Sequence, residues 1–200
     1  VQIHREDPDD YLADVYMQLG DIAMATGADA AAYFRQANNL YEAFYGQRNV
    51  YSIDALLRIS EVHLKNGDVA EAIRFAEQAL QRTIRSEQIV YAYDHWECQW
   101  QLLRCYEQQY ADGVRPIKFL QQDVALIKET LQEAAQIRQT YFSSGSRLYY
   151  AEKMTALNEM GIRLLAKYYS QRDQYFMEHV WLFSENNKAN LLRYRMDTRQ

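Results

Sequence analysis

The chain has 200 residues, of which 48% are hydrophobic and 24% charged, and its formal net charge is −5. This length suits one domain with a continuous core, and the acidic balance gives no support to nucleic-acid binding. No apolar run approaches the roughly 20 residues that a membrane span requires, and no signal peptide is recognisable. We therefore predict a cytoplasmic protein that binds neither nucleic acid nor membrane.

The charge is unevenly distributed along the chain. Residues 1–111 carry nine basic and seventeen acidic side chains, whereas residues 112–200 carry thirteen basic and ten acidic ones. Because an acidic surface attracts basic partners and repels acidic ones, the first part favours a basic partner. The chain starts at Val1 and ends in helix-like sequence, which leads us to expect a fragment of a larger protein.

Apolar residues recur at spacings of three and four almost throughout the chain, and no strand pattern persists. This periodicity predicts four helix pairs joined by short connections, so that successive helices are antiparallel neighbours. The predicted pairs are residues 10–26 with 29–45, 50–66 with 69–86, 89–110 with 116–142, and 146–170 with 173–197.

Residues that favour turns and helix ends support these boundaries. Gly27 and Gly67 are predicted to end helices in the left-handed conformation that glycine adopts most easily. Asp68 can cap the helix that follows it, and Pro116 suits a helix start, where its missing N–H is not needed. The small polar cluster 143–146 predicts a break or kink.

Gly27 and Gly67 also mark an internal repeat, because they lie forty residues apart and an alanine-rich helix follows each. A fixed period of this length indicates stacked repeats. In the second pair, Leu56 and Ile59 lie in the first helix, and small residues line one face of the second. These are Ala72, Ala76 and Ala79, which we predict to be buried against the first helix because small residues allow close helix packing.

This pattern resembles the tetratricopeptide repeat (TPR), in which large, small and aromatic residues alternate at fixed positions of two helices. The first pair fits with Leu19, Gly20, Ala23, Ala30, Phe34 and Ala37. The resemblance implies an all-α, right-handed superhelical solenoid of about four antiparallel helix pairs within a single domain, residues 1–200. The repeats are clear in 10–87 and become longer and divergent in 88–200.

A second resemblance covers the C-terminal part. The stretch 141–153, with its Ser-Ser-Gly-Ser-Arg sequence, is followed by Phe183-Ser184-Glu185-Asn186-Asn187-Lys188-Ala189-Asn190-Leu191-Leu192. This resembles the last helix pairs of bacterial TPR proteins that carry a CHAT domain, a caspase-like peptidase module. In that family the peptidase and its His–Cys dyad lie beyond the matched segment. The resemblance therefore implies the regulatory or recognition part of such a protein, with an adjoining domain after Gln200.

The sequence contains no motif of a catalytic or cofactor site. A phosphate-binding glycine loop, a Gly-x-Ser-x-Gly elbow and a His-Glu-x-x-His helix are all missing from it. His95, Cys98 and Cys105 share one predicted helix face but lack a fourth metal ligand. The two cysteines lie about 10 Å apart along that helix, too far for a disulfide. We predict buried thiols in a reducing compartment, and no enzyme activity, cofactor or metal.

The candidate site is the inner face of the solenoid, which the first helix of each pair forms. The repeat register places on it Asp14, Met17, Asp21, Leu57, Glu61, Trp100 and Arg104, together with Met24, Asp54, Lys65, Glu97 and Gln108. Acidic residues beside large apolar ones suit a protein or peptide with basic residues and apolar anchors. The alternative is that these acidic residues are only a solvated surface.

Three functions remain open from the sequence alone. The first is a non-catalytic protein-recognition scaffold within a bacterial TPR–CHAT protein. The second is the peptide-sensing TPR domain of a bacterial histidine kinase or transcription regulator. The third is an enzyme, although no motif in the sequence supports it. The domain encoded after residue 200 would separate the first two.

Overall fold

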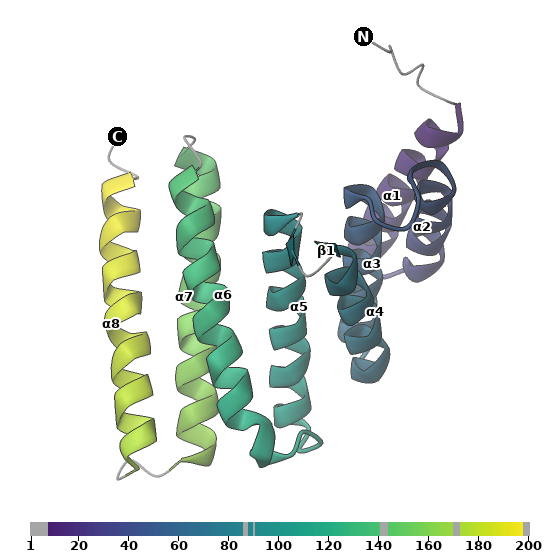
Figure 1. Cartoon of the computed structure of the whole chain (residues 1–200). Helices are drawn as coiled ribbons and strands as arrows, with labels where there is room; N and C mark the ends of the chain where they lie inside the picture. The colour runs from purple at the N-terminus through teal and green to yellow at the C-terminus, as the bar shows by residue number, and fades with distance from the viewer. Residues whose placement is uncertain (1–7, 86–87, 90, 141–143, 170–172, 198–200) are drawn as a thin grey trace. The chain divides into compact units, whose positions relative to one another are not determined.

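The structure is a computed structural model that describes residues 8–85, 88–89, 91–140, 144–169 and 173–197. It divides into two compact units, Val1–Cys105 and Tyr106–Gln200, with the border inside one helix. Both consist of helices in which successive members pack on one another (Figure 1), so the prediction of an all-helical fold of stacked helices is confirmed.

Unit 1 contains four helices and the beginning of a fifth. They are α1 (Pro8–Thr26), α2 (Ala31–Tyr45), α3 (Val50–Lys65), α4 (Val69–Arg82) and α5 (Ala92–Ala111), of which residues up to Cys105 belong to this unit. In chain order, α1 packs on α2, α2 on α3, and α3 on α4. The first four predicted helices therefore exist, with boundaries close to those expected.

The turns of unit 1 follow the local signals in the sequence. Gly27 and Gly67 have φ angles of 77° and 81°, which confirms the predicted left-handed residues. The Asp68 carboxylate accepts a hydrogen bond from the backbone N–H of Glu71 at 3.4 Å, and this confirms the cap of α4. Asn49 caps α3 in the same way, since its side-chain oxygen accepts from the N–H of Ser52 at 2.8 Å.

The connection between α4 and α5 differs from the prediction. The helices were expected to reach residue 86 and to start at residue 89, but α4 ends at Arg82 and α5 starts at Ala92. Between them lie two short antiparallel strands, β1 (Ile84–Arg85) and β2 (Gln88–Ile89), which pair Ile84 with Ile89. The β-branched residues Thr83, Ile84 and Ile89 favour an extended backbone over a helix.

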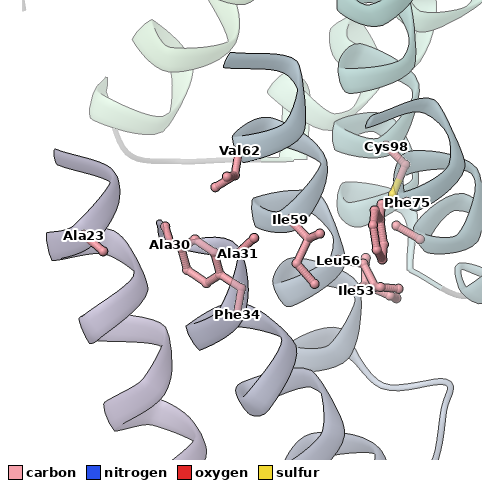
Figure 2. Close-up of a cluster of buried hydrophobic side chains, with 11 residues drawn as sticks. Ala23, Ala30, Ala31, Phe34, Ile53, Leu56, Ile59, Val62, Phe75 and Cys98 are labelled. Atoms are coloured by element: carbon pink, nitrogen blue, oxygen red, sulfur yellow. The ribbon is translucent and has the colours of Figure 1, made fainter. Parts of the chain in front are cut away.

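The core of unit 1 runs through all of its helices, as Figure 2 shows for residues from Ala23 to Cys98. Ala72, Ala76 and Ala79 are fully buried, and Ala79 belongs to the same cluster as Leu56 and Ile59. The prediction that the alanine face of α4 is buried against α3 is confirmed. In addition, the Ser60 hydroxyl donates to the carbonyl oxygen of Ala72 at 2.7 Å, so the two helices also share a hydrogen bond.

A buried polar network links α2, α3 and α4 next to this core. The guanidinium of Arg82 donates to the Asn38 and Ser52 side chains and lies 2.7 Å from the Glu42 carboxylate. The Ser52 hydroxyl in turn donates to the Asn38 side-chain oxygen at 2.7 Å. A buried cation is tolerated only when it is paired and hydrogen-bonded. The network therefore fixes which helix faces which, and no sequence motif indicated it.

Unit 2 contains the end of α5, a short 3-10 helix η1 (Ile117–Phe119), α6 (Leu120–Thr140), α7 (Ser144–Tyr168) and α8 (Gln174–Asp197). Helix α6 packs on α7 and α7 packs on α8, and the three run side by side in Figure 1. Pro116 directly precedes η1, as predicted for a helix start. The expected break at residues 143–146 agrees with α7 starting at Ser144, and residues 141–143 lie outside the described part of the chain.

The turn between α5 and α6 is held by a buried ion pair. The Arg115 guanidinium donates to both carboxylate oxygens of Asp123, at 2.6 and 2.7 Å, and the Tyr110 hydroxyl donates to the same carboxylate at 2.6 Å. Burial and the hydrogen bond to Asp123 raise the pKa of the Tyr110 phenol. The Arg115 guanidinium also lies 3.7 Å from the centre of the Tyr106 ring, so this turn has defined side-chain contacts.

Helix α8 packs on α7. It contains residues 183–192, the segment that resembles TPR–CHAT proteins. Phe183 is fully buried, whereas Leu192 is 62% exposed. The Asn190 amide donates to the Ala151 carbonyl oxygen at 2.6 Å and to the Thr155 hydroxyl at 2.8 Å. The side chains of Leu191 and of residues 193–197 lie outside the described part of the chain.

Two contacts require glycine in a helix because an aromatic ring lies against its backbone. A Cβ atom on Gly20 would lie 2.4 Å from the buried ring of Phe34, and one on Gly161 would lie 2.5 Å from that of Phe183. We predict that Gly20→Ala lowers the free energy of unfolding of unit 1 by about 1–2 kcal/mol, because overpacking outweighs the gain in helix propensity. Urea unfolding followed by circular dichroism measures this difference.

The matched control for Gly20→Ala is the same substitution in a Phe34→Leu background. The smaller side chain leaves room for the methyl group, so the additional cost of Gly20→Ala should be smaller there. Equal costs in both backgrounds would show that the ring contact is not the cause.

Arg115→Ala should destabilise unit 2 strongly. The substitution leaves the carboxylate of Asp123 buried without its cation, which typically costs about 3–5 kcal/mol. The double substitution Arg115→Met with Asp123→Leu removes both charges and should recover most of the loss, as measured by thermal unfolding. If Arg115→Ala costs no more than an exposed substitution such as Gln122→Ala, the ion pair does not hold the turn.

Candidate protein-binding face

Side chains from α1, α3 and α5 meet on one face of unit 1. The Arg58 guanidinium lies 3.8 Å from the carboxylate of Asp21, which joins α3 to α1. The Arg104 guanidinium lies 3.9 Å from the carboxylate of Glu61, which joins α5 to α3. Three of the predicted site residues, Asp21, Glu61 and Arg104, are therefore neighbours, and we call this surface the inner face.

Arg58 stands at the centre of the inner face, although the sequence prediction did not include it. Its guanidinium lies between three carboxylates, those of Asp21, Asp54 and Glu61, at 3.7–3.8 Å. Its spacing of four from Asp54 and three from Glu61 is the signal that could have identified it. These distances are too long for hydrogen bonds, and exposed ion pairs of this kind contribute little to stability. A partner could therefore replace them at small cost.

The acidic residues of the inner face are crowded at its α3–α5 edge. Burial, together with the smaller effect of the nearby charges of Asp54 and Glu97, raises the pKa of Asp94 to about 6. Burial also raises the pKa of Asp54, a shift that Arg58 partly opposes. The negative charge here is held at an energetic cost, so a cation from a partner would stabilise the ionised forms.

Several other predicted site residues also take part in packing within unit 1. The Asp14 carboxylate accepts a hydrogen bond from the Tyr41 hydroxyl at 2.5 Å, which ties α1 to α2. Met17 and Leu57 are half-buried and pack against the core cluster of unit 1. Trp100 is half-buried on α5. These residues lie at the register positions predicted for the inner face, but only part of each side chain is available to a partner.

The His63 ring has partners on its face and at both ring nitrogens. Its ring stacks on Phe75 at 5.4 Å between centres. One ring nitrogen lies 3.0 Å from the Arg35 guanidinium and the other 3.3 Å from the Asp68 carboxylate. A neutral ring that accepts from Arg35 and donates to Asp68 fulfils both contacts.

The two cysteines are buried free thiols, as predicted. Burial raises the pKa of both, that of Cys105 to about 11, so neither is a reactive thiolate near neutral pH. Within the described ranges, no group of three or more His, Cys, Asp or Glu side chains is arranged to hold a metal ion. The same part of the chain has no helix with the length and apolar character needed to cross a membrane.

Unit 2 contains a groove between α6 and α8, with α7 as its floor. Its volume is about 340 Å³, and its lining mixes apolar side chains with amides and one cation. The lining residues are Lys128, Leu131, Gln132, Ala135, Met154, Leu182, Asn186, Ala189 and Asn190. The amide of Asn190 is occupied by hydrogen bonds to α7, so its role there is structural. The sequence did not indicate this groove.

The comparisons with known proteins found no match, neither to a family model nor to a curated protein sequence.

The raised pKa of Asp94 predicts how the free energy of unfolding changes with pH. Because the pKa of Asp94 is higher in the folded chain than in the unfolded one, folding takes up a proton between about pH 4 and 6, and stability falls as the pH rises through that window. Asp94→Asn removes the charge, so at pH 7 it should raise the free energy of unfolding by roughly 0.5–1 kcal/mol, an amount reduced by solvent screening.

The gain from Asp94→Asn should disappear below about pH 4, where the wild-type carboxyl is protonated in both states. Urea unfolding at pH 7 and pH 4 measures both values. The exposed Glu129→Gln is a control that should change stability little at either pH. A gain from Asp94→Asn that is equal at both pH values would show that the cost of ionising Asp94 is not its cause.

Proposed function

We propose that the chain is a non-catalytic protein-recognition scaffold whose inner face binds a segment with basic residues and apolar anchors. The observation that carries this proposal is the cross-helix arrangement of Asp21, Arg58, Glu61 and Arg104 on three first helices of unit 1. Helices stacked in this way offer a continuous surface that no single helix could provide.

The chemistry of the surface supports a basic partner. The acidic residues Asp54, Asp94 and Glu97 repel one another at one edge, so the lysine or arginine of a partner would relieve that repulsion. Met17, Leu57 and Trp100 are half-buried at register positions predicted for the same face. Partly exposed methionine and tryptophan side chains are typical anchors of protein interfaces, where a few such residues carry most of the affinity.

The finer proposal is that the helix pairs form a right-handed, TPR-like solenoid within a bacterial TPR–CHAT protein. The glycine turns, the alanine face of α4 and the stacking of successive helices support a TPR-like arrangement. The sequence 183–192 supports the CHAT association by its resemblance alone. Sequencing the gene beyond residue 200 tests this part: a His–Cys peptidase domain is expected there, and a kinase or DNA-binding domain would contradict it.

Charge reversal tests the inner face as a binding site. The probe is a fluorescent peptide selected from a random phage-displayed library on the 200-residue chain, and we expect selection to enrich lysine or arginine together with leucine, methionine or tryptophan. Asp21→Lys with Glu61→Lys should weaken its binding by about tenfold or more, because each reversal replaces attraction by repulsion. The loss should shrink at high salt, since exposed charges are screened within about 10 Å at 0.1 M.

The control must change the net charge equally outside the inner face. Glu77→Lys, Gln81→Lys and Gln36→Lys together add the same positive charge at exposed positions of α2 and α4. Anisotropy titrations at two salt concentrations compare the two variants, and circular dichroism checks that both are folded. If the control weakens binding as much as the inner-face reversal, only overall charge matters and the assignment fails.

A further inference from the structure

The surface of α1 carries a stripe of large apolar side chains exposed within unit 1. Their exposed fractions range from 39% to 68%, and the five residues are Tyr11, Leu12, Val15, Leu19 and Ile22. At 100° per residue they fall within an arc of about 100°, so they form one continuous strip. Single exposed hydrophobic residues are common, but a contiguous patch indicates an interaction site. We call these five residues the α1 stripe.

The side of α1 next to the stripe is already occupied by the core. Ala13, Gly20 and Ala23 are buried there, and Gly20 lies against the ring of Phe34 in α2. Helix α1 is therefore apolar on two sides. A helix that closes a stack of repeats normally has a polar outer side, because that side faces water. The composition of α1 is that of an internal helix with neighbours on both sides.

The internal repeat shows what covers the equivalent surface of α3. The forty-residue period places the α1 stripe in register with Tyr51, Ser52, Ala55, Ile59 and Val62. The last four are buried. The Ser52 hydroxyl donates to the Asn38 side chain of α2, and the Tyr51 ring stacks on Tyr41 of α2. Figure 2 shows Ile59 and Val62 beside Ala30, Ala31 and Phe34 of α2. The second helix of the preceding pair covers this surface.

Helix α5 repeats the arrangement within unit 1. Glu61 and Arg104 occupy equivalent inner positions, and the same offset makes Cys98 and Cys105 the equivalents of Ala55 and Val62. Both thiols are fully buried. Cys98 shares a cluster with Phe75 and Ala79, and Cys105 shares one with Val69 and Ala72, all residues of α4. In both α3 and α5, the second helix of the preceding pair covers the positions whose equivalents in α1 are exposed.

We propose that the α1 stripe is the docking site for the second helix of a further helix pair of the same polypeptide, packed on α1 as α2 packs on α3. The occupant is an amphipathic helix whose apolar side has small residues and one aromatic ring. The contacts of α2 with α3 define this chemistry through Ala30, Ala31, Phe34, Ala37 and Asn38.

Charge argues against a second copy of the chain as the occupant. Helix α1 contains four aspartates and no basic residue, and Asp14 and Asp21 lie along one margin of the stripe at helical spacing. An antiparallel two-fold pair of α1 helices would use the same surface on both copies and bring the two acidic margins together. A helix of different sequence avoids this repulsion.

A tandem duplication of residues 10–49 in the full chain tests the proposal. Its insertion places a copy of α2 before the original α1, with the natural connection 46–49 between them, so the original α1 has the neighbour that α3 has. Ile22→Cys in one copy of α1 at a time reports coverage through its rate of reaction with a soluble thiol reagent. The native thiols are buried and give a slow background.

We expect the thiol introduced by Ile22→Cys to react at least about tenfold more slowly in the second copy of α1 than in the first, because reaction then requires local opening. The first copy is the matched control, since its stripe has the same sequence and no preceding helix. Adding Val15→Glu and Leu19→Glu to the second copy should restore fast reaction. Equal rates in both copies would overturn the proposal.

A second measurement uses the 200-residue chain without the duplication. Val15→Glu with Leu19→Glu should leave the helix content and the unfolding midpoint unchanged, because these side chains are already exposed within unit 1. A large loss of stability would mean that the stripe is buried within the chain and would overturn the proposal. A wild-type dimer in sedimentation that these substitutions dissociate would overturn it in favour of self-association.

Discussion

The structure depends on the fact that none of its helices can bury its apolar surface alone. Helix α3 is the clearest case: Ile59 and Val62 lie with residues of α2, while Leu56 belongs to a cluster that also contains Phe75 and Ala79 of α4. Each contact is possible because one partner is small, as with the alanines of α4 or with Gly20 beneath Phe34. Close packing of this kind ties helices that follow one another in the chain.

Buried polar groups add specificity that apolar packing by itself does not provide. In unit 1, Arg82 reaches Asn38 and Glu42 of α2 and Ser52 of α3. In unit 2, Asp123 receives hydrogen bonds from Arg115 and Tyr110. A helix shifted by one turn would leave these groups buried without partners, which is costly. The networks therefore define the register of the helices, while the alanine and leucine contacts supply most of the burial.

The interactions on the inner face contribute less to stability than those in the core. Its ion pairs around Arg58 are long and partly exposed, so they add little to stability and can be exchanged for contacts with a partner. At its acidic edge, burial and, to a smaller extent, repulsion between neighbouring carboxylates disfavour the ionised forms of Asp54 and Asp94. A surface that the fold does not need for its own stability is suited to recognition, and this separation is the physical basis of the proposed scaffold function.

The sequence by itself determined the features that depend on neighbours along the chain. The three- and four-residue periodicity defined the helices, Gly27 and Gly67 defined two turns, and the forty-residue period placed Asp21 and Glu61 on one face. The tertiary structure alone decided the contact of Arg58 with Asp21, the Arg82 network and the exposure of the α1 stripe. These features depend on which residues from distant parts of the chain meet, and periodicity carries no information about that. Helices α1 and α3 have similar apolar faces in their sequences. Only the packed structure shows that α2 covers this face of α3, whereas the equivalent face of α1, the α1 stripe, is exposed.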